Sequence, residues 1–226
     1  MRSLIMAISR TRWFLALAGA LALAAMAVAL FMQRRDPAAC PYALRVFLQL
    51  PRPCMSRERV LALLAPAPGQ RILEIGPGLG YYSLDLAAAL APGGRLDLLD
   101  IQAPMLDAVI QRATARGVGG ITPHLGDAQA CPFPDASFDA ILTVATLGEI
   151  PDRTQALREM HRVLKPTGHL VIGEGQPDPH MVTRRALTEL ASAVGFTMVQ
   201  WEGNPLGYLA RLEPGTALHT ATVSSP

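Results

Sequence analysis

The sequence predicts a doubly wound, mostly parallel α/β sheet that closes with a C-terminal antiparallel strand pair and is preceded by one N-terminal transmembrane helix. Three observations support this fold class. An uncharged apolar stretch lies near the N-terminus, apolar runs then alternate with amphipathic helical patterns, and two consecutive strand-like runs follow. A chain of 226 residues has room for one globular domain and an appendage.

The apolar stretch at residues 13–32 contains no charged residue and has two arginines close to each end. A helix of this length spans about 30 Å, the thickness of a bilayer's hydrocarbon core. We therefore expect residues 1–35 to form a basic tail and a single-pass membrane anchor. The alternative is a cleaved signal peptide, because the start is basic and Ala25-Met26-Ala27 resembles a cleavage site. The basic residues near the two ends are balanced, so they do not set the orientation.

Three further segments follow the anchor. Residues 36–55 mix proline, arginine and large apolar side chains, which is typical of a juxtamembrane linker. Residues 56–213 form the predicted folded domain, and residues 214–226 a disordered tail. Within the domain, strands are predicted at 71–75, 95–100, 119–125, 138–144 and 168–173, and helices at 56–65, 80–91, 103–116, 152–164 and 180–194.

Local signals support these elements. Ser56 is a suitable N-cap for the first helix, and Asp152 with Gln155 resembles a capping box. The runs at 196–201 and 205–212, joined across Gly203-Asn204, predict the C-terminal hairpin.

Charge and cysteine content exclude several classes of protein. Of the net charge of +2, five arginines in residues 1–35 contribute +5, which leaves −3 for the remainder and argues against a nucleic-acid partner. Cys40, Cys54 and Cys131 are widely spaced and odd in number, so we expect neither a zinc site nor a disulfide framework. The sequence also contains no cluster of acids and histidines that suggests a metal.

The first predicted strand runs into a glycine-rich turn with Gly76, Gly78 and Gly80, followed by a helix. Glycine lets the backbone turn tightly and approach a ligand without an intervening Cβ. Taken alone, such a turn also fits a plain strand-to-helix loop.

Two acids strengthen the ligand-binding interpretation. Asp100 ends the second strand, where a carboxylate can accept hydrogen bonds from ribose hydroxyls. Asp127 follows the third strand, where a carboxylate could take the exocyclic amine of adenine. Either acid alone also fits a solvated loop, but acids after successive parallel strands meet at the edge where such sheets bind ligands.

Five stretches between Gln70 and Gly173 resemble a class I S-adenosylmethionine-dependent methyltransferase of the broad type-11 group, which has a Rossmann-like fold. The first motif reads Leu73-Glu-Ile-Gly-Pro-Gly-Leu-Gly80. The others are Leu99-Asp100-Ile101, Gly126-Asp127-Ala128, residues 131–142 and residues 157–168, where Thr167 replaces the usual glycine.

The resemblance implies S-adenosylmethionine as the cofactor. It implies that Glu74 and the glycines lie near the methionine moiety, Asp100 on the ribose, Ile101 on the adenine face, and Asp127 with Ala128 on the adenine. Two alternatives stay open: an NAD-type oxidoreductase, although Gly-x-Gly-x-Gly differs from the dinucleotide spacing, and a non-catalytic membrane scaffold.

The acceptor is expected to be a small lipophilic or membrane-associated molecule, and the catalytic domain to be cytoplasmic because S-adenosylmethionine is cytosolic. No catalytic residue is assigned. In-line methyl transfer gains much of its rate from positioning, so a dedicated base is not obligatory. The candidate proton acceptors are Tyr81, Glu149, Glu174, His180 and Tyr208.

Overall fold

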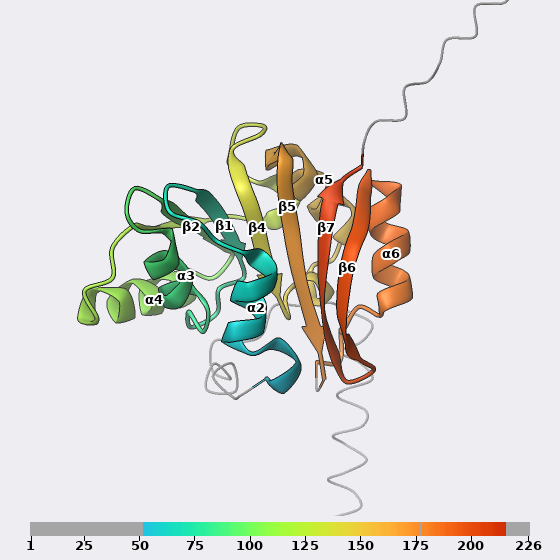
Figure 1. Cartoon of the computed structure of the whole chain (residues 1–226), viewed down its shortest axis with the longest axis horizontal. Coiled ribbons are helices and arrows are strands. Elements are labelled where there is room, and N and C mark those ends of the chain that lie inside the picture. Colours follow the sequence, from blue (N-terminus) through green and yellow to red (C-terminus); the bar gives the residue numbers. More distant parts are fainter. Residues whose placement is uncertain (1–51, 177, 216–226) are drawn as a thin grey trace, which may run out of the picture. The chain divides into compact units, whose positions relative to one another are not determined.

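The computed structural model describes residues 52–176 and 178–215 (Figure 1). The predicted anchor at 13–32, nearly all of the predicted linker and the chain after residue 215 lie outside these residues. Within 52–176 and 178–215, no helix has both the length and the apolar character needed to cross a membrane.

Seven strands form one sheet in the order β3-β2-β1-β4-β5-β7-β6 (Figure 1). The first five are parallel, and β7 runs antiparallel to both β5 and β6. The predicted doubly wound sheet with a C-terminal antiparallel pair is thus confirmed. The bounds are β1 (Arg71–Ile75), β2 (Arg95–Asp100), β3 (Ile121–Leu125), β4 (Phe138–Val144), β5 (Leu164–Gly175), β6 (Phe196–Asn204) and β7 (Gly207–Pro214).

Helices cover both faces of the sheet. They are α2 (Arg57–Leu64), α3 (Ser83–Leu90), α4 (Ala103–Ala115), α5 (Arg153–Val163) and α6 (Arg184–Ala193). Ile72 packs in the core cluster with α2, α3 and α4, whereas its neighbour Leu73 packs in the cluster with α5 and α6. Successive strand residues point to opposite faces, so the two clusters are the two layers of the core. In Figure 1, α2 lies in front of the sheet and α5 behind it.

Two predicted N-caps are observed. The side chain of Ser56 accepts a hydrogen bond from the Arg59 amide, and Asp152 Oδ1 accepts one from the Gln155 amide at 2.9 Å. The reciprocal half of the predicted capping box is wrong, however. The Asp152 amide donates to the side chain of Gln129, and the Gln155 side chain donates to the Gln129 carbonyl instead.

Several predicted boundaries move. The hairpin turns at Pro205-Leu206, because Gly203 and Asn204 belong to β6 and pair with Tyr208 and Gly207. Strand β5 begins at Leu164 rather than at residue 168, since Leu164 pairs with Phe138 of β4. The helices predicted to begin at 80 and 180 begin at Ser83 and Arg184, the latter after the N-cap Thr183.

The domain also begins before residue 56. Pro53–Met55 form a short 3-10 helix, η2, and Met55 is only 4 % exposed. The hydroxyl of Tyr82 donates to the Met55 carbonyl oxygen at 2.7 Å. The last three residues of the predicted linker therefore pack as part of the domain. At the other end, Pro214 belongs to β7 and not to the tail.

Candidate cofactor site

A pocket opens at the carboxyl ends of β1, β2, β3 and β4. The strand order reverses direction between β1 and β4, and open α/β sheets bind ligands at such a switch point. Seven of the eight predicted site residues line this one pocket: Glu74, Gly76, Gly78, Asp100, Ile101, Asp127 and Ala128.

The three glycines of the first turn have different surroundings. All have positive φ, at +67° for Gly76, +54° for Gly78 and +72° for Gly80. A Cβ on Gly76 would lie 2.3 Å from Thr146 Oγ1, so glycine allows the turns after β1 and β4 to approach closely. A Cβ on Gly80 would meet Val109 of α4 at 3.0 Å, and Gly80 does not line the pocket. Gly80 thus packs between α3 and α4.

Glu74 is a buried carboxylate in the pocket wall, only 2 % exposed. Its Oε2 accepts a hydrogen bond of 2.6 Å from the hydroxyl of Ser83, at the start of α3. Burial raises the pKa of Glu74 to about 7, because the charged form loses its hydration, and the Ser83 bond opposes this only in part. The side chain therefore changes charge near neutral pH.

Asp100 and Ile101 form the wall at the end of β2. Asp100 Oδ1 accepts a hydrogen bond from the Gln102 amide at 2.8 Å, which fixes the carboxylate at the pocket. Burial raises the pKa of Asp100 above its ordinary value. The apolar side chain of Ile101 is 57 % exposed and lines the same pocket. Such a side chain can pack against the face of a bound ring.

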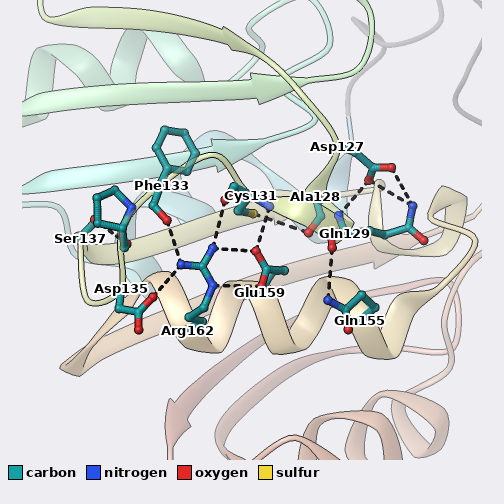
Figure 2. Close-up of polar contacts among 11 residues, drawn as sticks. Asp127, Ala128, Gln129, Cys131, Phe133, Asp135, Ser137, Gln155, Glu159 and Arg162 are labelled. Atoms are coloured by element: carbon teal, nitrogen blue, oxygen red, sulfur yellow. Dashed lines mark hydrogen bonds and ion pairs between the residues drawn. The ribbon is translucent and has the colours of Figure 1, made fainter.

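Asp127 and Ala128 lie where the chain leaves β3. Asp127 caps the short 3-10 helix η3 (Ala128–Ala130) and accepts hydrogen bonds from the backbone and side-chain nitrogens of Gln129 (Figure 2). Ala128 is buried. The carboxylate of Asp127 is exposed and lines the pocket, so it can accept a further donor from a ligand.

The loop that follows is held by Arg162 of α5 (Figure 2). Its guanidinium group donates to the carboxylates of Glu159 and Asp135 and to the carbonyl oxygens of Phe133 and Cys131. All five N–H donors of an arginine are used in this way. The arrangement connects residues 131–142 with residues 157–168, because Arg162 and Glu159 of α5 bind the backbone of the loop that follows η3.

In the segment after β4, sequence reasoning singled out only Glu149 and missed its neighbours. Ala145, with φ of +52°, and Thr146 line the pocket, as do Ile150 and Pro151. Arg52 and Gln129 also line it. The position of residues 145–151 directly after a central strand was the available signal, because every parallel strand ends at this edge.

The five candidate proton acceptors separate into two groups. Tyr81 and Glu149 line the pocket, whereas Glu174, His180 and Tyr208 do not. Tyr208 donates to the Val182 carbonyl at 2.7 Å, and Glu174 Oε2 accepts from the Val182 amide at 3.0 Å. No group of three or more potential metal ligands occurs within the described ranges.

The pocket fits S-adenosylmethionine. The backbone turn at Gly76 lines the pocket, Glu74 and Asp100 present carboxylates for an ammonium group and for ribose hydroxyls, and Ile101 offers an apolar surface for a ring. The sheet order, with the pocket at its switch point, is that of the Rossmann-like fold of class I methyltransferases.

Comparison with known proteins agrees with this class. Residues 73–172 match the sequence model of the family described as "Methyltransferase domain". The demethylmenaquinone methyltransferase of Geobacillus kaustophilus is 37 % identical over 115 residues, which cover 51 % of this chain and 49 % of that protein. The ubiquinone/menaquinone biosynthesis C-methyltransferase of Cellvibrio japonicus is 40 % identical over 107 residues, 47 % of this chain and 43 % of that protein. The chain thus spans about half the length of these relatives.

The crystal structure of an S-adenosylmethionine-dependent methyltransferase from Aquifex aeolicus has the same fold, with a TM-score of 0.70 at 20 % identity. The match covers 76 % of this chain and 98 % of that one. S-adenosylmethionine is accordingly the cofactor of the domain, and the NAD-type alternative is set aside.

Proposed function

We propose that the protein transfers the methyl group of S-adenosylmethionine to a small lipophilic acceptor of the quinol type at a membrane surface. The observation that carries this proposal is the composition of the pocket wall beyond the cofactor residues. Its side chains are largely apolar or aromatic and include Tyr81, Met105, Val144 and Ile150. The relatives named for demethylmenaquinone and ubiquinone/menaquinone methylation support the acceptor class.

The bound cofactor supplies an electrophilic methyl group on its sulfonium. The protein's part is to hold the acceptor in line with that methyl, to exclude water with the apolar wall and to take up the acceptor's proton. We propose Glu149 for the last role, because its side chain lines the pocket and has no place in the expected contacts to the methionine moiety, ribose or adenine.

A membrane location completes the proposal. Residues 13–32 remain the predicted anchor, with the catalytic domain on the cytoplasmic side where S-adenosylmethionine is made. Arg52 lines the pocket and Met55 is held by Tyr82, so the segment that leads back toward the N-terminus joins the domain beside the site. Confinement to a bilayer would raise the effective concentration of a lipophilic acceptor held in the same plane.

The test compares methyl transfer by the full chain and by a chain beginning at Arg52, which retains the packed Met55. Each is given a long-chain quinol in vesicles and a short-chain, water-soluble quinol, with radiolabelled cofactor. We expect truncation to reduce transfer to the vesicle-bound quinol much more than transfer to the soluble one. Equal rates after truncation would contradict the membrane part of the proposal.

The same assay tests the non-catalytic scaffold. A scaffold would bind S-adenosylmethionine but transfer no methyl group to any acceptor. A second test of the location is protease protection of the full chain in sealed vesicles, together with the N-terminal sequence of the mature protein. A mature chain that begins after the apolar stretch and lies outside the cytoplasm would reject the anchor.

A further inference from the structure

Gln129 lies between two walls of the cofactor pocket. Its side-chain nitrogen donates to Asp127 Oδ2 at 2.8 Å and to Oδ1 at 3.1 Å, and its backbone amide donates to Oδ1 at 2.8 Å (Figure 2). On the other side, Gln129 Oε1 accepts the backbone amide of Asp152 at 2.9 Å. Residues 149–151, immediately before Asp152, line the pocket together with Asp127.

These contacts allow only one orientation of the Gln129 amide group. Its nitrogen must face the carboxylate of Asp127 and its oxygen the N–H of Asp152, because the reverse would place oxygen against oxygen and N–H against N–H. A third contact, from the Gln155 side-chain nitrogen to the Gln129 carbonyl at 3.3 Å, fixes the backbone (Figure 2). Gln129 is therefore held by α5 and in turn holds the exposed carboxylate of Asp127.

We infer that Gln129 is a positioning residue, which orients the Asp127 carboxylate for the amine of adenine and fixes the wall at residues 149–151 against it. The inference rests on the proposed function, since it takes the Asp127 contact to adenine as given. Without the side-chain amide, the Asp127 carboxylate would keep only the backbone bond to Oδ1 and could turn about it, and ordering it on binding would cost affinity. The Gln129 amide does this ordering before the ligand arrives.

The first test uses calorimetric titration of the full chain with S-adenosylhomocysteine. Gln129→Met keeps the length of the side chain and removes only the side-chain hydrogen bonds. We therefore expect a dissociation constant about fivefold to tenfold higher, on the scale of one hydrogen bond. Gln129→Glu places a second carboxylate against Asp127. At pH 8 we expect this variant to lose more affinity for S-adenosylhomocysteine than Gln129→Met does. The loss, measured against the wild type at the same pH, should shrink as the pH falls to 5.5, because the new carboxyl group then gains a proton to donate.

The second test separates positioning from a general effect on the fold. S-inosylhomocysteine carries a carbonyl oxygen where S-adenosylhomocysteine carries the amine, so position 6 of its ring cannot donate to Asp127. We expect Gln129→Met to weaken the adenosyl ligand severalfold and to leave the inosyl ligand nearly unchanged. A merely structural role would weaken both ligands equally.

The matched control is Gln200→Met. Gln200 lies on the edge strand β6 away from the pocket, and its side-chain nitrogen also donates to a carboxylate, Glu202 Oε1, at 2.7 Å. We expect this variant to bind both ligands as the wild type does.

Unchanged affinity in Gln129→Met, or equal losses for the two ligands, would overturn the inference. If the wild type binds S-adenosylhomocysteine but methylates nothing, the proposed function fails while the role of Gln129 stands. If the wild type binds neither ligand, both fail.

Discussion

The hydroxyl of Ser83 donates to Glu74 Oε2 at 2.6 Å, and both side chains are buried. Glu74 lies one residue before the end of β1. It points from β1 toward the start of α3, and the Ser83 bond holds it in the pocket wall. A buried acid with one neutral donor keeps its proton to unusually high pH, and for Glu74 the pKa is raised to about 7.

We expect cofactor affinity to increase with pH through this pKa. If the ionised Glu74 receives the ammonium of the methionine moiety, the protonated form binds poorly, and the apparent dissociation constant scales with the inverse of the ionised fraction. Between pH 6 and pH 8 the dissociation constant of S-adenosylhomocysteine should fall about tenfold. For Glu74→Gln, calorimetry should give a higher dissociation constant that changes little with pH. A wild-type profile that is also flat would contradict the assignment.

Asp100→Ala should weaken cofactor binding by about 1.5–3 kcal/mol, the scale of hydrogen bonds to a charged group, and leave the fold intact. The Asp100 carboxylate lies at the end of β2 and is expected to accept hydrogen bonds from the ribose hydroxyls. Titration with S-adenosylhomocysteine measures the loss, and far-UV circular dichroism checks the fold. The matched control is Asp107→Ala, an exposed carboxylate on α4. An unaltered dissociation constant in Asp100→Ala would reject the ribose assignment.

Asp97→Asn should destabilise the protein and change its response to acid. Asp97 is fully buried in β2 and contacts Arg71 Nε at 2.8 Å, the Arg95 guanidinium at 3.1 Å and His124 Nε2 at 2.6 Å. Burial opposes its ionisation, but the hydrogen bonds from Arg71 and His124 hold its pKa below the ordinary value.

A lowered pKa contributes stability that is present above the unfolded-state pKa, near 3.9 as an approximate value, and is lost as the pH falls through the folded-state pKa. We expect Asp97→Asn to unfold with a free energy about 1.5–3 kcal/mol smaller at pH 7, and the difference to shrink below pH 4. Urea unfolding at pH 7 and at a pH below 4 measures the two free-energy differences, with Asp107→Asn as control. A constant difference at all pH values would mean that the charge of Asp97 is not what stabilises the fold.

Glu174→Gln should stabilise the protein in mild alkali. Glu174 is fully buried near the end of β5, and its Oε1 has no hydrogen-bond partner in the part of the chain that the structure describes. Burial raises its pKa to about 8, with the Val182 amide opposing the shift. An acid whose folded-state pKa is raised loses stability as the pH rises from its unfolded-state value to its folded-state value.

For Glu174 this window runs from about pH 4.5 to pH 8. A neutral glutamine avoids the cost of burying the charge, so the variant should gain more than about 1.4 kcal/mol over the wild type at pH 8.5, the equivalent of one pKa unit, and little at pH 4. Thermal unfolding across this range measures the gain. Equal unfolding temperatures for the two proteins at pH 8.5 would contradict the raised pKa.

Local sequence determined most of the secondary structure and the main part of the site. The bounds of β1, β2 and β4 agree with the predicted strands, because short apolar runs between turn signals identify buried parallel strands. Glu74, Gly76, Asp100 and Asp127 could be placed in one site since each lies within two residues of a strand end. Parallel strands end at the same edge of a sheet, so spacing along the chain was enough to bring these residues together.

Contacts between distant segments decided the rest. Gly80 and Gly76 are alike in sequence, but only the tertiary structure shows that Gly76 lines the pocket whereas Gly80 packs against Val109 of α4. Gln129 resembles any loop residue until α5 brings Asp152 to it, and the Asp152 amide then donates to Gln129 Oε1 rather than to the side chain of Gln155 as expected. Backbone preference and hydrophobic period act over a few residues and can be read from sequence, whereas the partner of a polar side chain depends on which segments the tertiary fold places beside it.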